Sequence, residues 1–176
     1  MVGKNDLGSI IPGADGLLAR DAGIFLSITV ADCLLIFLYD PKIRAIGLLH
    51  AGWRGLAEKI ISSGVRKMIS DFGNNLCDIR TEIGPGIGPC HFEVKNDVAG
   101  KFGEFSREAM AEKGGRKYLD LKKIARLQLL NEGIAGDHIE TSGECTHCLD
   151  SKYFSYRRDK PENIEAMMAI FGIRGS

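Results

Sequence analysis

The residues with the clearest capacity for chemistry are Asp32, Cys33 and His50. Asp32 and Cys33 lie inside one apolar stretch, and His50 ends the next one. If the two stretches form a hairpin around Pro41-Lys42 with a two-residue loop, Cys33 lies directly opposite His50. Opposed residues of antiparallel strands have Cβ atoms about 4.5–5.5 Å apart. The pair could then form a thiolate–imidazole couple or bind one metal ion.

Two observations bear on this interpretation in opposite directions. A change of one residue in the loop would turn Cys33 or His50 to the other face, and a free cysteine is often simply a buried small side chain. The segment 51–55 (AGWRG) instead favours function, because it combines two glycines, the single tryptophan and Arg54 directly after His50. Glycine permits close backbone approach, and Arg54 could hold an anion near the start of a helix.

The segment 83–91 (IGPGIGPCH) has three glycines and two prolines after an expected strand. Its backbone N–H groups could bind a phosphate or a ribose, or it could be a rigid structural turn. It lacks the third glycine of a dinucleotide-binding fingerprint and the Gly-Lys-Ser/Thr of a P-loop. The structural turn is the favoured interpretation.

A third feature is Cys145-Thr146-His147-Cys148, a C-x-x-C with a histidine inside it. A zinc site or a redox dithiol would each need partners. Cys90 and His91 are the residues left to pair, and they lie far away in the sequence. We therefore expect loop cysteines near a core.

Residues 153–159 (YFSYRRD) alternate aromatic and polar side chains, which is typical of a half-buried strand. Arg157 and Arg158 at its end could pair with carboxylates or line an anionic pocket.

Apolar spacing and turn residues predict the elements that would position these side chains. The predicted strands cover 24–39 (two in succession), 43–49, 78–83, 153–157 and 166–173. The predicted helices run from Leu56 to a stop at Gly73, and over 121–131 with Asp120 as N-cap and Gly133 as stop. Interleaved strands and helices indicate an α/β or α+β fold with a mixed sheet.

Length and composition exclude several classes of protein. The 176 residues form one expected domain and carry 23 Lys+Arg against 23 Asp+Glu, which argues against a broadly basic nucleic-acid binder. The longest apolar run, 24–39, is too short for a comfortable membrane span and contains Asp32. Five cysteines without a signal peptide indicate a reducing, cytoplasmic setting.

Four segments, taken in order, resemble the YfiH-like family, which is also labelled polyphenol oxidase or laccase-domain and is identified with purine nucleoside phosphorylases. They are 31–34 (ADCL), 50–55 (HAGWRG), 83–90 (IGPGIGPC) and 154–159 (FSYRRD). The resemblance runs from about Gly13 to Arg174. It implies an α+β fold, an α/β sandwich with mixed β-sheets and flanking helices, as a single domain over 1–176.

The resemblance also implies a Zn²⁺ site of one cysteine and two histidines. Cys33 and His50 match two ligands, and the third belongs to a Gln-Val-His segment upstream of residues 14–16. Residues 1–13 contain no histidine. The chain is therefore expected to be an N-terminally shortened member of the family, and an exposed sheet edge leaves open a homo-oligomer.

The activity that the resemblance implies is phosphorolysis of adenosine or inosine with phosphate, a transferase reaction. Adenosine deamination, a hydrolase reaction, is a related activity. Cys33 and His50 would bind the metal, Asp32 would orient a ligand or shuttle a proton, and Arg54 and Arg157 would hold phosphate. Three alternatives stay open: a copper-dependent polyphenol oxidase, a catalytically impaired or purely binding member, and a metal-free hydrolase with Cys33 as nucleophile and His50 as base.

Overall fold

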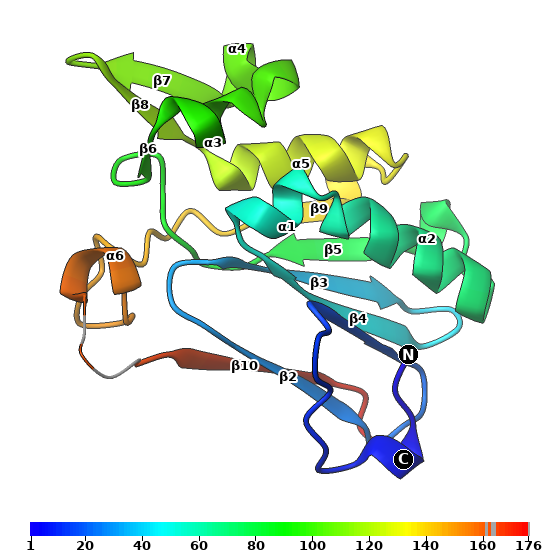
Figure 1. Ribbon diagram of the computed structural model, residues 1–176. Helices are drawn as coiled ribbons and strands as arrows, with labels where there is room; N and C mark the ends of the chain where they lie inside the picture. Colours follow the sequence, from blue (N-terminus) through cyan, green and yellow to red (C-terminus); the bar gives the residue numbers. More distant parts are fainter. Residues whose placement is uncertain (161, 163–164, 176) are drawn as a thin grey trace.

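A five-stranded sheet forms the middle layer of the structure, a computed structural model that describes residues 1–160, 162 and 165–175 (Figure 1). In spatial order its strands are β1 (Gly16–Ala19), β4 (Ala45–Ala51), β3 (Leu34–Asp40), β5 (Arg80–Ile83) and β9 (Ile139–Thr141). β5 and β9 run parallel, and the other neighbours pair antiparallel. The sheet is therefore mixed.

Three helices cover one face of this sheet: α1 (Trp53–Ala57), α2 (Ile60–Phe72) and α5 (Leu121–Asn131) (Figure 1). α2 buries Ile61, Val65 and Met68, whose helical spacing places them on the side facing the sheet. Gly73 ends α2 in the left-handed conformation with φ of 73°, as predicted.

The prediction for α5 is also confirmed. It spans Leu121–Asn131, and the Asp120 carboxylate accepts a hydrogen bond of 3.0 Å from the backbone nitrogen of Lys123. Gly133 follows the helix with φ of 94°.

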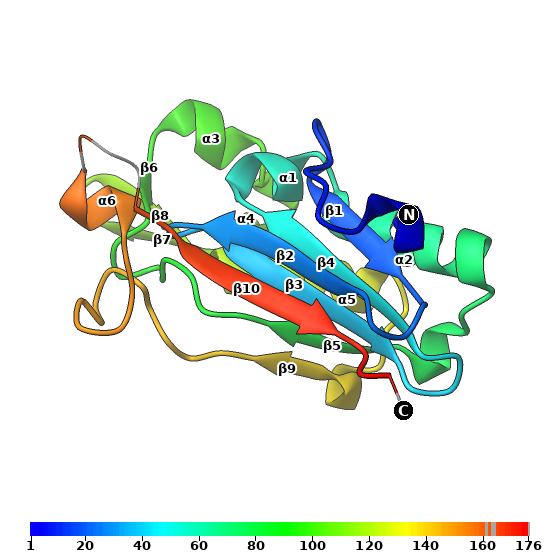
Figure 2. The same ribbon diagram turned by 90° about the horizontal axis from the view of Figure 1, so that it is seen from below.

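A two-stranded sheet of β2 (Phe25–Val30) and β10 (Met167–Gly172) lies on the opposite face of the central sheet (Figures 1 and 2). Alternate residues of β2 face a second core, where Leu26 and Val30 are buried together with Leu48 of β4. The structure thus has the predicted α+β sandwich, with helices, central sheet and small sheet as successive layers.

The segment 93–119 forms a smaller unit beside α5 (Figure 1). Its sheet has the order β6 (Glu93–Val94), β8 (Arg116–Leu119) and β7 (Met110–Lys113), next to the short helices α3 (Asn96–Gly100) and α4 (Ser106–Ala109). Four single-turn 3₁₀ helices complete the described chain: η1 (Lys4–Asp6), η2 (Leu76–Asp78), η3 (Gly103–Phe105) and η4 (Gly136–His138). None of the helices in the described residues is long and apolar enough to cross a membrane.

The predicted register of the β3–β4 hairpin is wrong. The turn has four residues, 41–44, so Asp40 pairs with Ala45 and His50 faces Leu35 rather than Cys33. The longer turn forms because Asp40 Oδ1 accepts hydrogen bonds from the backbone nitrogens of Lys42 and Ile43. The shift is two residues, and side chains alternate with period two, so Cys33 still approaches His50 from the same side.

The strand predicted over 153–157 is wrong as well. Residues 153–155 have irregular backbone, and Tyr156–Asp159 form the short helix α6. The Ser155 hydroxyl caps this helix by accepting a hydrogen bond of 3.2 Å from the backbone nitrogen of Arg158. The aromatic–polar alternation of residues 153–159 therefore belongs to a capped helical turn and not to a strand. The other predicted strands are shorter or shifted: 43–49 is observed as β4 and 78–83 as η2 followed by β5.

Candidate functional site

Asp32 organises the loop that joins β2 to β3. Its backbone has φ of 76° and its side chain is buried, with 8% of the residue exposed. The carboxylate accepts three hydrogen bonds: from Thr146 Oγ1 at 2.6 Å, from Ser155 Oγ at 3.0 Å and from the backbone nitrogen of Arg157 at 2.7 Å. Asp32 therefore ties the start of β3 to two segments more than 100 residues further along the chain.

Cys33 and His50 lie on either side of Gly52. A Cβ atom placed on Gly52 would come within 2.8 Å of Cys33 Sγ and 3.8 Å of His50 Nε2. Glycine at this position therefore lets the backbone pass close to both the thiol and the imidazole. Burial raises the pKa of the half-buried Cys33 thiol, and the negative charge of Asp32 raises it further, while Arg54 opposes the shift.

Asp15 is a site residue that sequence reasoning missed. Its Oδ1 lies 3.4 Å from His50 Nδ1, and its carbonyl oxygen accepts a hydrogen bond of 2.7 Å from the His50 backbone nitrogen. With its proton on Nδ1 facing the carboxylate, the imidazole presents the Nε2 lone pair to the space at Gly52. This is the carboxylate–histidine arrangement that orients histidine ligands in metal sites. A single Asp before β1 carried no signal of this contact in the sequence.

Arg157 lines a cavity that also includes Trp53, the residue after Gly52, and Arg54 lies against the Trp53 ring. The cavity has a volume of about 390 Å³ and is lined by Trp53, Phe92, the segment 93–95, Asp97, Val98 and Arg157. The Arg54 guanidinium lies 4.4 Å from the centre of the Trp53 ring, and that of Arg157 lies 5.2 Å from the centre of the Phe92 ring. The cavity thus combines aromatic and cationic side chains with the carboxylates of Glu93 and Asp97.

A second group of metal-ligating side chains is formed by Cys90, His91, Cys145 and Cys148, here called the CHCC cluster. Their ligand atoms all lie within 4.8 Å of one another. Cys90 Sγ is 3.6 Å from both Cys145 Sγ and Cys148 Sγ, and Cys148 Sγ is 3.4 Å from His91 Nδ1. The expectation of unpartnered loop cysteines is therefore wrong. The Gly86–Cys145 bridge brings the two segments side by side in space.

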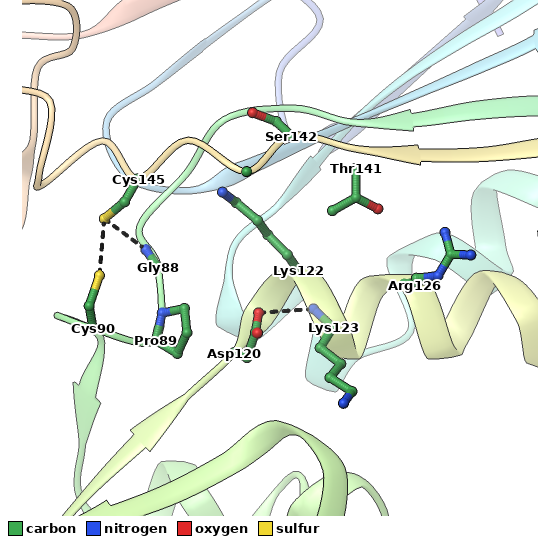
Figure 3. Close-up of a pocket in the computed structure, with 11 residues that line it drawn as sticks. Gly88, Pro89, Cys90, Asp120, Lys122, Lys123, Arg126, Thr141, Ser142 and Cys145 are labelled. Carbon is green, nitrogen blue, oxygen red and sulfur yellow. Dashed lines mark hydrogen bonds between the residues drawn. The ribbon is translucent and has the colours of Figure 1, made fainter.

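The surroundings of the CHCC cluster shift the pKa values of two of its thiols in opposite directions. Burial raises the pKa of Cys90 to about 12, with further contributions from the neighbouring thiols Cys148 and Cys145. Burial acts in the same direction on Cys145, but hydrogen bonds from the backbone nitrogens of Gly88 and Cys148 outweigh it and leave that pKa lowered. Figure 3 shows Cys145 between the Gly88 nitrogen and Cys90.

The Gly-Pro segment 84–89 is a structural turn. The backbone nitrogen of Gly84 donates to Leu35 O, that of Ile87 to Asp32 O and that of Gly88 to Cys145 Sγ. These three N–H groups are unavailable to a phosphate or a ribose. A Cβ on Gly86 would come within 3.0 Å of the Asp32 carbonyl oxygen and 2.5 Å of Leu34, so close packing requires glycine there.

The two groups differ in how completely the chain supplies ligands. A thiolate and an imidazole are suitable ligands for zinc, and for copper too. In the described part of the chain, the CHCC cluster is the one set of three or more such groups that gathers closely enough to hold an ion. The Cys33–His50 pair offers two side chains of ligand type, and Asp15 contacts the second ring nitrogen of His50.

Fold and site together define the class: a three-layer α+β protein with a cysteine–histidine pair at the end of its central strands. The chain belongs to the family described as "Multi-copper polyphenol oxidoreductase laccase", whose family model matches residues 1–173. It is similar to the protein named purine nucleoside phosphorylase YlmD of Geobacillus stearothermophilus, with 36% identity over 98% of this chain. It also resembles the Bacillus subtilis protein of that name, with 31% identity over 98% of this chain.

The solved structures give the same result. The crystal structure of YlmD from Geobacillus stearothermophilus superposes with a TM-score of 0.93 over 99% of this chain and 68% of that one. A Bacillus licheniformis protein titled YfiH superposes with a TM-score of 0.85 at 36% identity, over 91% of this chain and 61% of that one. The chain spans 64% and 63% of the lengths of the two curated YlmD relatives.

Proposed function

We propose that the chain forms the active-site part of a purine nucleoside phosphorylase that cleaves adenosine or inosine with phosphate. The observation that carries the proposal is the position of Cys33 and His50 around Gly52, the residue before Trp53, which lines a cavity together with Phe92 and Arg157. The names of the relatives support the substrate class.

The ligand pair is proposed to hold Zn²⁺ through Cys33 Sγ and His50 Nε2. Soft thiolate and neutral imidazole suit zinc, and the Asp15 carboxylate opposite Nδ1 favours the required tautomer. When bound there, zinc supplies a Lewis acid that polarises a substrate oxygen or lowers the pKa of a water molecule. Glycine at position 52 places no side chain against either ligand atom.

The neighbouring cavity has the chemistry that a nucleoside and a phosphate need. Trp53 and Phe92 offer apolar faces on which a purine ring can stack. Arg157 lines the same cavity and Arg54 lies over the Trp53 ring, which supports the proposal that both guanidinium groups bind phosphate oxygens. The volume of about 390 Å³ is within the range of small-molecule sites.

In phosphorolysis a phosphate oxygen forms a bond to C1′ of the ribose while the bond from C1′ to the purine nitrogen breaks. The bonding electrons leave with the purine, which takes up a proton. Arg54 and Arg157 are proposed to hold the attacking phosphate, and the aromatic walls are proposed to hold the base. The phosphate then approaches C1′ from the side opposite the departing base.

Asp32 is proposed to act as a positioning residue, and not as a proton shuttle. Its carboxylate already accepts three hydrogen bonds from within the protein and is buried. These bonds hold the loop that carries Cys33, and they also hold the backbone of Arg157. Both residues belong to the proposed site.

Adenosine deamination is a second reaction that the same residues support. Water replaces the amino group at C6 of the purine, giving inosine and ammonia. The reaction needs the base in the same cavity and an activated water at the Cys33–His50 pair. Like phosphorolysis it therefore requires Cys33 and His50, but it does not require phosphate.

Product analysis tests the proposal. The chain is incubated with inosine, with or without phosphate, and the products are separated by liquid chromatography and ³¹P NMR. We expect hypoxanthine and ribose 1-phosphate to form in equal amounts and only with phosphate. Cys33→Ala should lower the rate about 100-fold or more, whereas Cys77→Ala, which changes an exposed cysteine, should not.

Other outcomes would overturn the proposal in recognisable ways. Base release without phosphate indicates a hydrolase, and oxygen uptake with a phenolic substrate indicates the copper oxidase that the family description suggests. Activity that survives removal of the metal but not Cys33→Ala indicates a cysteine nucleophile. Lack of any product from the folded chain contradicts the proposal directly.

A further inference from the structure

We propose that Cys90, His91, Cys145 and Cys148 form a closed structural zinc site, separate from the Cys33–His50 pair. The CHCC cluster has three thiols and one imidazole, drawn from the end of the Gly-Pro turn and from the C-x-x-C segment. This ligand set is one of the standard combinations of four-coordinate structural zinc.

The distances within the CHCC cluster agree with tetrahedral coordination. With Zn–S bonds of about 2.3 Å and Zn–N bonds of about 2.0 Å, two ligand sulfurs lie about 3.8 Å apart and a sulfur lies about 3.5 Å from a nitrogen. The observed separations are 3.6 Å for two sulfur pairs and 3.4 Å for the sulfur–nitrogen pair. These three separations match zinc coordination to within a few tenths of an ångström, and every other pair of ligand atoms lies within 4.8 Å.

The surroundings of the cluster resemble the outer shell of a metal site. The Gly88 backbone nitrogen donates a hydrogen bond of 3.2 Å to Cys145 Sγ, which stabilises a thiolate. The His147 ring stacks on the His91 ring at 3.7 Å between centres and 13° between planes, which fixes the orientation of the ligand. A Cβ on Gly88 would come within 3.2 Å of Cys90 Sγ, so glycine lets the turn approach the sulfurs.

The arrangement favours a metal over a disulfide. Cys90 is equally close to Cys145 and Cys148, so a bond to one would leave the other thiol and His91 without a partner. A zinc ion uses all four groups. The chain supplies every ligand of a four-coordinate ion, which leaves no position for substrate and assigns the site a structural role.

The structural role follows from what lies between the ligands. Thr146, inside the C-x-x-C segment, is fully buried and donates its hydroxyl hydrogen bond to Asp32. The carbonyl oxygens of Thr146 and His147 each accept a hydrogen bond of 3.0 Å from Arg158. Zinc at the cluster would hold this segment against the Gly-Pro turn and thereby keep Asp32, and the loop of Cys33, in place.

Thiol protection in the wild-type chain tests the proposal without relying on a variant that folds. The protein is purified under reducing conditions, loaded with zinc, alkylated with iodoacetamide, and mapped by mass spectrometry with and without a chelator. We expect Cys90, Cys145 and Cys148 to be protected until the chelator is added. Exposed Cys77 should react in both cases. Equal reaction of Cys90, Cys148 and Cys77 in the zinc-loaded protein would overturn the proposal.

Metal content then separates this site from the proposed catalytic pair. We expect Cys33→Ala to retain about one equivalent of zinc and the cobalt-substituted form to show sulfur-to-metal charge transfer. Adding Cys148→Ser to Cys33→Ala should reduce that absorption by about one third and weaken zinc binding, whereas adding Cys77→Ser should change neither. If Cys33→Ala removes all bound metal, the CHCC cluster holds none. If Cys33→Ala removes no zinc, the CHCC cluster still holds its metal and the proposal that Cys33 binds metal is disproved.

Discussion

The two groups of thiol and imidazole ligands differ in completeness, although they lie on connected loops of one molecule. The Cys33–His50 pair has two ligand atoms, and the nearby Trp53 lines a cavity with Phe92 and Arg157. The CHCC cluster has four ligand atoms within 4.8 Å of one another. An open coordination position serves chemistry, whereas a closed set serves folding. The difference predicts that changes near each group affect different properties.

A short chain of hydrogen bonds connects the two groups. Thr146 lies between two ligands of the CHCC cluster and donates to Asp32, the residue before Cys33. Asp32 also accepts from the Arg157 backbone nitrogen, and Arg157 lines the cavity. The buried Asp32 carboxylate therefore links the CHCC cluster to the loop that carries Cys33.

Asp32→Asn should have the largest effect, because it breaks this connection. The amide keeps the size of the side chain and tolerates the positive φ, but it turns one hydrogen-bond acceptor into a donor that faces other donors. We expect the free energy of unfolding to fall by about 3 kcal/mol. A denaturant titration with Asp21→Asn, at an exposed position, provides the measurement and its control. Equal midpoints for the two variants would mean that the two groups are independent.

Gly52→Ala and Gly88→Ala form a matched pair that sharpens the comparison, since each added Cβ would meet a sulfur of one group. At Gly52 the methyl group fills the space between Cys33 and His50, so we expect activity to fall about 100-fold with little change in melting temperature. At Gly88 it presses on Cys90 and Cys145, so weaker zinc retention by the CHCC cluster is expected.

Gly100→Ala is the control for both, because a Cβ there has no neighbour within 4 Å. Measurements of melting temperature, zinc content and phosphorolysis on the three variants give the comparison. If Gly52→Ala and Gly88→Ala change the same property to the same extent, the division into an open and a closed group is wrong.

Local signals in the sequence predicted the elements that local chemistry determines. The bounds of α5 follow from the Asp120 cap and the apolar spacing after it, and the structure has the same bounds. The approach of Cys33 to His50 was predicted with a register that is wrong by two residues, because Asp40 forms a longer turn than the two-residue loop. The alternation of strand side chains preserved the face, so the conclusion about proximity survived the error.

Long-range contacts were the part that the sequence could not reveal. Cys90 lies 55 residues from Cys145, and the Gly86–Cys145 bridge that joins their segments leaves no periodic pattern. The aromatic alternation of 153–157 indicated a strand, but the buried Asp32 carboxylate stabilises a capped turn there instead. The C-x-x-C together with Cys90-His91 was the available signal, and testing those two pairs as one ligand set would have found the cluster.

Asp15→Asn should have the smallest effect, and this effect should be confined to the Cys33–His50 pair. The asparagine oxygen can still accept from His50 Nδ1, but without a full charge it supports the tautomer and the basicity of Nε2 less strongly. We expect metal affinity at the Cys33–His50 pair to fall about tenfold, the lower end for such supporting residues, because Asp15 is largely exposed. Competition with a chromophoric chelator measures this affinity, and the CHCC cluster provides an internal reference whose zinc should be retained. A loss shared by both groups would show that Asp15 acts through stability, whereas an unchanged affinity would leave His50 oriented by the β4 backbone alone.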